Sequence, residues 1–249
     1  MTILTTPDPA LTLCFTGNRN HPNKKADFTG AFLPEMRSFM KLWGIDKAKN
    51  HLMVDLDAAE ISKKRSVYNF IERRATEEGK APTALVFSCH GFTNRIELGL
   101  RGATGAKEFA KFLRAQHVKH GTPGQTALTV ILYCCSTGGG AGEGGDGGFA
   151  DKLRDSLCEE GFVDCRVVGS ETAGHATMNS RKRVFDGMGS PVGGTGGSWV
   201  VQPGTALFKK WQKAMTANSV KLPVAKDFRF QFPFMSIASI HKWLIANVA

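Results

Sequence analysis

Short runs of apolar residues alternate along this chain with segments whose apolar residues recur at helical spacing. The first pattern is typical of strands buried on both faces, and the second of amphipathic helices. The runs predict strands at residues 10–15, 51–56, 83–89, 127–134 and 165–169, and a sixth at 198–202. The helical spacing predicts helices at residues 28–43, 63–76, 104–117, 149–159, 206–217 and 235–246.

Strands separated by helices of this length usually pair in parallel, because the chain must cross back over the sheet before the next strand starts. We therefore expect an α/β fold, a three-layer α/β/α sandwich around a mostly parallel six-stranded sheet. In such sheets the ligand binds outside the carboxyl ends of the strands. Functional residues should therefore directly follow a strand.

Two predicted strands end in residues that can perform covalent chemistry. His90 and Gly91 follow the strand at 83–89, and Cys135 follows the strand at 127–134. A thiolate is a strong nucleophile, and a nearby imidazole can take its proton or stabilise its charge. Gly91 has no Cβ, so its backbone N–H can approach a scissile carbonyl. Together with the N–H of Cys135 it would form an oxyanion hole.

The alternation of side chains along a strand separates two adjacent cysteines. Consecutive residues point to opposite faces, so Cys134 and Cys135 cannot both face the crevice. Cys134 belongs to the apolar run and is expected under a flanking helix. Cys135 stands at the strand end before small residues and is the predicted nucleophile. The six cysteines include no Cys-x-x-Cys pair, which indicates free thiols in the reducing cytoplasm and no metal site.

Composition narrows the possible partners. The apolar runs are far shorter than the roughly 20 residues of a membrane-spanning helix, so no membrane association is expected. The net charge is +10, but the basic residues are dispersed and match no nucleic-acid-binding module, so nucleic acid is not expected. The glycine-rich residues 138–148 include acidic residues and no lysine. They are expected to form a mobile loop rather than a nucleotide site.

Three short segments resemble metacaspases and related clan CD cysteine peptidases, which have a caspase-type domain. Residues 87–91, FSCHG, are similar to the Ser-Gly-His-Gly of that family. Residues 133–138, YCCSTG, resemble its Asp-Ser/Cys-Cys-His-Ser-Gly block, and residues 197–202, GSWVVQ, resemble the Gly-Ser-Trp-Phe-Ile-Gln of the caspase small subunit. The resemblance spans roughly residues 10–215, and the order of the segments makes it more specific than any one of them.

This resemblance implies one caspase-like domain over residues 1–249, with a large-subunit-like part at about 10–170 and a small-subunit-like part at about 171–249. It implies an endopeptidase for protein or peptide substrates, with self-processing as a further option. Cys135 would form a thioester acyl-enzyme, and His90 would protonate the leaving amine. Related proteins occur as monomers and as homodimers. Calcium activates some metacaspases, but this sequence has no EF-hand-like loop, and no other cofactor is implied.

The residues that select substrates in the family are replaced here. Tyr133 stands where metacaspases have an acid and caspases a glutamine, and Val192 stands where caspases have an arginine. Arg19 and His175 also have a simpler interpretation. Arg19 would be a solvated arginine in a loop, and His175 an ordinary loop histidine. The residues expected near the substrate are Arg19, Tyr133, Glu171, His175 and Trp199.

Two other functions compete with the peptidase. In an α/β-hydrolase, residues 134–138 would form a nucleophile elbow without its first glycine, with Ser136 as the nucleophile and His241 as a late base. The two helical crossovers expected before His90 argue against that fold. A non-catalytic caspase-like domain that binds acidic partners is the other alternative. The missing specificity residues and the +10 charge favour it.

Overall fold

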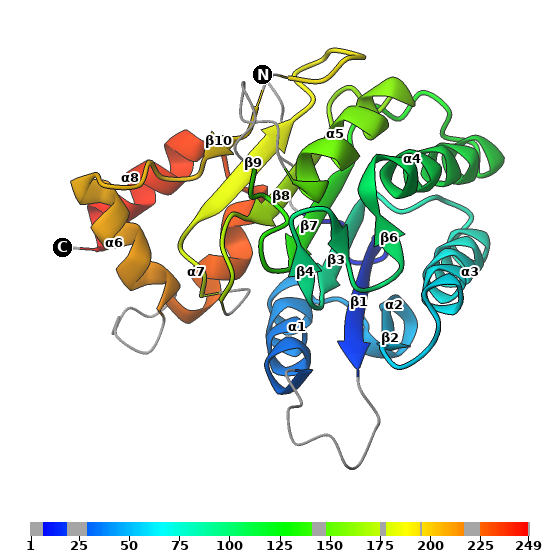
Figure 1. Ribbon diagram of the computed structural model, residues 1–249, viewed down its shortest axis with the longest axis horizontal. Coiled ribbons are helices and arrows are strands. Elements are labelled where there is room, and N and C mark those ends of the chain that lie inside the picture. Colours follow the sequence, from blue (N-terminus) through cyan, green and yellow to red (C-terminus); the bar gives the residue numbers. More distant parts are fainter. Residues whose placement is uncertain are drawn as a thin grey trace.

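The computed structural model describes residues 7–18, 29–140, 148–174, 178–194, 196–216 and 225–248. Within these residues a central sheet of seven strands has the order β10-β9-β8-β7-β3-β1-β2 (Figure 1). The five strands from β8 to β2 are parallel, while β9 and β10 add antiparallel pairs at one edge. The strands are β1 (Thr12–Asn18), β2 (His51–Asp55), β3 (Ala84–Ser88), β7 (Thr129–Tyr133), β8 (Arg166–Ser170), β9 (Lys182–Asp186) and β10 (Ser198–Trp199).

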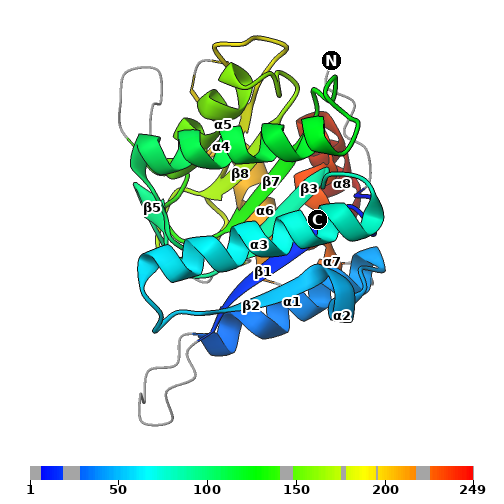
Figure 2. The ribbon, with the colours of Figure 1, turned by 90° about the vertical axis from the view of Figure 1, so that its right-hand side faces the viewer.

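Helices cover both faces of the sheet, so the expected three-layer α/β fold is confirmed. Figure 2 shows α3, α4 and α5 on one face, and buried side chains pack them against the sheet. The side chains of α1, α6, α7 and α8 pack on the opposite face. The helices are α1 (Thr29–Trp43), α2 (Lys47–Asn50), α3 (Glu60–Glu78), α4 (Gly102–Lys119), α5 (Phe149–Glu159), α6 (Ala206–Met215), α7 (Ala225–Gln231), the 3-10 helix η3 (Phe232–Phe234) and α8 (Ile237–Asn247).

The expected number of strands was too small. The pattern predicted six strands, and the described residues place seven in the central sheet. The missed strand is β9, which opens with two basic residues and therefore carries no uniform apolar run. β9 pairs with β8 and β10 with β9, so the parts expected at 10–170 and 171–249 share one sheet.

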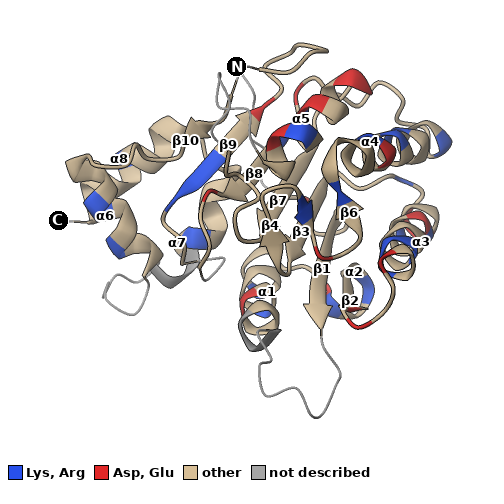
Figure 3. Cartoon of the chain, viewed as in Figure 1, with Lys and Arg blue, Asp and Glu red and all other residues tan. Residues whose placement is uncertain are grey.

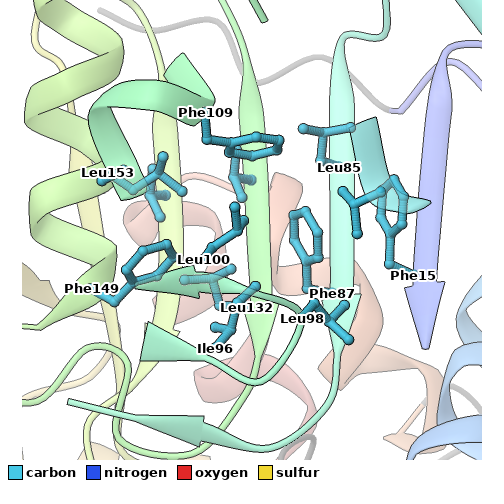
Figure 4. Close-up of a cluster of buried hydrophobic side chains, with 14 of the residues drawn as sticks. Phe15, Leu85, Phe87, Ile96, Leu98, Leu100, Phe109, Leu132, Phe149 and Leu153 are labelled. Carbon is cyan, nitrogen blue, oxygen red and sulfur yellow. The ribbon is translucent and has the colours of Figure 1, made fainter. Parts of the chain in front are cut away.

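A small antiparallel sheet, also missed, follows β3 directly. It consists of β4 (Gly91–Phe92), β5 (Arg95–Ile96) and β6 (Leu100–Arg101). Strands of two residues are too short to show any periodicity in the sequence. Ile96, Leu98 and Leu100 are fully buried in the core beneath α4 and α5 (Figure 4). This core contact anchors the small sheet at the carboxyl edge of the large one.

Charged residues of both signs are mixed over the helices. Figure 3 shows lysine or arginine beside aspartate or glutamate along α3, α4 and α5. Lys64 pairs with Glu108 at 2.9 Å and Lys119 with Glu72 at 2.8 Å, so ion pairs link α3 to α4. Exposed pairs of this kind contribute only about 0–1 kcal/mol each.

A buried histidine, His117, and a partly buried one, His51, make the stability of the fold depend on pH. His117 accepts or donates hydrogen bonds with the Pro82 carbonyl at 3.0 Å and the Thr122 hydroxyl at 3.2 Å, and His51 bonds to the Thr16 hydroxyl at 2.8 Å. Burial lowers the pKa of each histidine from 6.5 to about 4. The unfolded chain therefore binds more protons between these values, so the free energy of unfolding falls as the pH falls from about 6.5 to 4.

The loss should be up to roughly 3 kcal/mol per histidine, since each pKa unit is worth about 1.4 kcal/mol. Urea denaturation at several pH values across this window measures it. In His117→Gln the dependence of unfolding free energy on pH should become shallower, because one titrating group is gone. An unchanged slope would show that His117 is accessible to protons in the folded chain.

Candidate functional site

His90 and Cys135 follow neighbouring parallel strands at the same register. The pairs between β3 and β7 run from Ala84 with Thr129 to Ser88 with Tyr133, a constant offset of 45 residues. His90 and Cys135 have that same offset, 135 − 90 = 45, and follow the last pair by two positions. The structure therefore brings the two predicted catalytic residues to adjacent points on the carboxyl edge of the sheet.

Strand alternation continues up to the residues that precede the site. Along β7, Leu132 and Cys134 belong to the core beneath α3–α5, whereas Tyr133 belongs to the core on the α1 side. Cys135 follows in the turn after β7, and its thiol faces the Gly174 carbonyl. The His90 ring lies edge-on to the ring of Phe32 in α1, with centroids 5.1 Å apart. The His90 side chain thus leaves the sheet toward α1.

The adjacent cysteines have the contrasting environments that the sequence predicted. Cys134 is fully buried, and its Sγ lies 3.5 Å from the Sγ of Cys89. Burial raises the pKa of the Cys89 thiol, so Cys89 stays protonated and unreactive. Cys135 alone among the six cysteines is not buried. Its thiol donates a hydrogen bond to the backbone carbonyl of Gly174 at 2.9 Å.

The backbone of Gly91 lies directly against that of Cys135. A Cβ added at Gly91 would stand 2.8 Å from the Cys135 nitrogen and 2.7 Å from the Cys134 Cβ, and would also meet the Cys135 carbonyl oxygen. Real Cβ atoms do not approach backbone this closely. The contact explains why glycine is needed here, and it brings the backbone of Gly91 against the backbone of Cys135.

The hydrogen-bond pattern of the small sheet turns the Gly91 N–H outward. The His90 carbonyl accepts a bond from the Glu97 nitrogen at 3.0 Å, so His90 and Glu97 form a hydrogen-bonded pair. Bonded and non-bonded pairs alternate along an antiparallel ladder, so Gly91 and Ile96 form a non-bonded pair. The N–H of Gly91 therefore points away from β5, toward the free edge of β4.

The chain turns sharply immediately after Cys135. Ser136 has φ of 58°, a left-handed conformation that is uncommon for a residue with a side chain. Its nitrogen donates to the Thr172 carbonyl at 3.1 Å, and the Gly138 nitrogen donates to the Ser170 carbonyl at 2.8 Å. These bonds tie residues 136–138 to the end of β8. The turn leaves Cys135 at the surface of the sheet edge.

The structure does not bring His241 to Ser136, as the α/β-hydrolase alternative requires. The Nε2 of His241 lies 3.3 Å from the Val200 carbonyl, next to β10. In the sheet order, β10 stands three strands away from β7. A nucleophile elbow also leads straight into a helix, whereas α5 begins only at Phe149.

The residues expected to contact substrate lie in different places. Tyr133 is buried in the core between rings of Phe39 and Phe230, and burial raises its pKa. Glu171 accepts a bond from the Arg181 guanidinium at 2.6 Å, at the start of the connection from β8 to β9. Trp199 lies on β10 with the Arg183 guanidinium 5.5 Å from its ring. Arg19 and His175, and residues 141–147 of the glycine-rich loop, lie outside the described residues.

Of the three consecutive basic residues 181–183, Arg181 is exposed, whereas the next two lie inside the fold. Lys182 and Arg183 are buried in β9, which carries the basic colour in Figure 3. The Lys182 ammonium donates to the Ser170 hydroxyl at 2.7 Å and lies 5.6 Å from the Tyr133 ring. Burial lowers the pKa of Lys182 to about 8, although the nearby Glu35 and Cys135 act in the opposite direction and raise it. A buried cation therefore lies below the site.

An open pocket of about 660 Å³ adjoins Cys135. Most of its lining was not predicted from the sequence, although those residues follow His90 or the fifth predicted strand, where functional residues are expected. No helix in the described ranges is long and apolar enough to cross a membrane, and no group of metal-ligating side chains is found there. The pocket is lined by Gly91, Phe92, Thr93, Asn94, Cys135, Ser136 and Ala173.

Comparison of this chain with models of protein families, with curated proteins and with solved structures found no match. The function must therefore be argued from the residues at the edge of the sheet.

Proposed function

We propose that this chain is a cysteine endopeptidase with a caspase-like fold, in which Cys135 is the nucleophile and His90 its acid–base partner. The observation that carries the proposal is the common register of His90 and Cys135 on β3 and β7, with the backbone of Gly91 against that of Cys135. A nucleophile, a proton carrier and two backbone donors are the groups that acyl transfer requires.

The reaction follows from the chemistry of these groups. His90 takes the proton of the Cys135 thiol, and the resulting thiolate attacks the carbonyl carbon of the scissile peptide bond. The N–H groups of Gly91 and Cys135 hydrogen-bond the oxygen as it becomes negative. The C–N bond then breaks, and the departing nitrogen takes a proton from His90. His90 then takes a proton from water, whose oxygen attacks the thioester carbon, and the C–S bond breaks. His90 returns this proton to the Cys135 sulfur, and the second product leaves as a carboxylic acid.

In this structure the Cys135 thiol donates its proton to the Gly174 carbonyl. The thiol must leave that acceptor to react. This contact supports the proposal because the Cys135 Sγ atom already lies against a backbone carbonyl, the group that it would attack in a peptide substrate.

The experiment is a map of cleavage products. Wild type and Cys135→Ala, purified in the same way, are each incubated with a mixture of unfolded proteins, and new N-termini are identified by mass spectrometry. Cuts that occur only with wild type and share one dominant residue are the expected result. If cuts are equal in both samples, the peptidase proposal is wrong.

Ester hydrolysis that is lost in Ser136→Ala but kept in Cys135→Ala would favour the α/β-hydrolase alternative. An absence of Cys135-dependent cuts, together with a Cys135 that does not react with iodoacetamide at neutral pH, would favour the non-catalytic binding domain. These outcomes separate the three functions with one set of purified proteins.

A further inference from the structure

The pocket beside Cys135 is built from two distant parts of the chain. One wall is the turn of the small sheet, residues 91–94, and the opposite wall is Ala173, beyond β8. Cys135 and Ser136 complete the lining between them. Among the described residues that line the pocket none is charged, in a chain whose net charge is +10. The pocket therefore differs in character from the rest of the surface.

Phe92 supplies the largest apolar surface of the pocket. Its side chain is 44% exposed, although it is an aromatic residue next to a folded core. The Arg95 guanidinium lies 4.5 Å from the centre of its ring, and Arg95 is also within 3.8 Å of Glu60. The ring is thus held on one side by a cation–π contact. Ile96 of the same small sheet is buried in the core shown in Figure 4, which fixes this wall.

The opposite wall is held by hydrogen bonds at the base of the β8–β9 connection. The Thr172 carbonyl accepts bonds from the Ser136 nitrogen at 3.1 Å and from the Asn179 side-chain amide at 2.7 Å. The Glu171 nitrogen donates to the Arg181 carbonyl at 2.8 Å. Ala173 follows directly after these anchored residues. Both walls are therefore in place before a ligand arrives, as is usual for small-ligand sites.

We infer that this pocket binds an uncharged, apolar side chain of the peptide substrate at a position next to the scissile bond. The inference rests on the proposed peptidase function and names its substrate class. Since Cys135 is itself part of the lining, a side chain in the pocket belongs to a residue adjoining the carbonyl that the sulfur attacks. A charged side chain would lose water there without gaining a partner of opposite charge, whereas an apolar side chain gains from leaving water.

The test uses two alkylating probes that need no peptidase activity. Chloroacetamide and N-benzylchloroacetamide both react with a thiolate: the sulfur bonds to the CH2 carbon and chloride leaves. The second probe carries an apolar ring one amide bond from that carbon. Rates of Cys135 alkylation are measured by intact mass, and each is divided by the rate of the same probe with glutathione. This ratio removes differences in intrinsic reactivity.

We expect the benzyl probe to react roughly 10-fold faster than the small probe after this correction, as burial of part of a ring allows. The preference should fall to within about 3-fold in Phe92→Ala, because the apolar wall is removed. Ala173→Phe, which fills the pocket from the other side, should also remove it. Val118→Ala is the matched control, because Val118 is an exposed apolar residue on α4 outside the pocket. It should leave the preference unchanged.

A preference near one in wild type, or a preference that survives both Phe92→Ala and Ala173→Phe, overturns the inference. Thermal melts confirm that the variants fold. The map of cleavage products gives the second readout: wild type should favour a large apolar residue on one side of the cut, and Phe92→Ala should not. If the probe preference is found without any Cys135-dependent cleavage, the proposed function is wrong and the pocket does not bind a peptide substrate. An apolar site beside Cys135 would then remain. Cleavage without an apolar preference supports the peptidase and overturns this inference.

Discussion

Replacing Cys135 by alanine is expected to lower kcat/KM for a cleaved peptide by roughly 10⁴-fold or more, because the covalent step loses its nucleophile. The adjacent Cys134→Ala should stay within about 3-fold of wild type in kcat/KM, since substitutions outside the reacting groups leave the transition state largely untouched. The Sγ of Cys134 faces Cys89 in the core, on the other side of the strand from Cys135. Neighbouring residues with the same side chain thus serve as variant and control.

The measurement is steady-state cleavage of a peptide chosen from the mapped sites, with both variants purified identically. Cys134→Ala removes one buried sulfur, so its free energy of unfolding should fall by about 1–2 kcal/mol. Assays below the melting temperature of both variants keep this effect out of the kinetics. Equal losses of kcat/KM in the two variants would mean that packing of the strand end, and not the Cys135 thiol, controls the activity.

Gly91→Ala is expected to lower kcat by about 100-fold, which is the usual loss when one oxyanion donor is removed or displaced. The new Cβ would stand 2.8 Å from the Cys135 nitrogen, so one of the two backbones has to move. Movement of either one separates the N–H groups that are proposed to bind the oxyanion. The free energy of unfolding should also fall, by roughly 1–3 kcal/mol, because the contact is with backbone rather than with a flexible side chain.

Gly124→Ala is the matched control for this substitution. A Cβ at Gly124 meets no atom within 4 Å, so the change should leave both kcat and stability within experimental scatter. Comparison of kcat, KM and urea denaturation for the two variants separates a local effect from the general effect of adding a methyl group. A fully active Gly91→Ala would show that the Gly91 N–H takes no part in binding the oxyanion.

Much of the fold could be predicted because strands buried on both faces require continuous apolar runs. The run ending at Cys89 and the run ending at Cys134 are of this kind, and both lie near the centre of the sheet. The helix at 149–159 agrees with α5 to the residue, since its apolar face is clearly periodic. β9 was missed because it lies toward the antiparallel edge of the sheet, where two basic side chains take part in the strand. The buried hydrogen bond from Lys182 of β9 to Ser170 cannot be recognised in the sequence.

The candidate site also has a part that could be predicted from the sequence and a part that could not. The sequence alone placed His90 and Cys135 at strand ends, and the strand pattern together with the family resemblance favoured Cys135 over Cys134. Whether those strands are neighbours, and in which register, depends on pairing between segments that are far apart in the chain. The offset of 45 residues indicates that His90 and Cys135 are neighbours only because β3 and β7 pair in that register.

The pocket depends still more on the tertiary structure. Phe92 and Ala173 are separated along the chain and share no motif, and they line one pocket because the small sheet and the β8–β9 connection meet at the same edge. Local sequence therefore determined which residues could react, since periodicity and strand ends are properties of neighbouring residues. Only the packing of distant segments decided what surrounds them, because burial, register and pocket walls are set by contacts between elements.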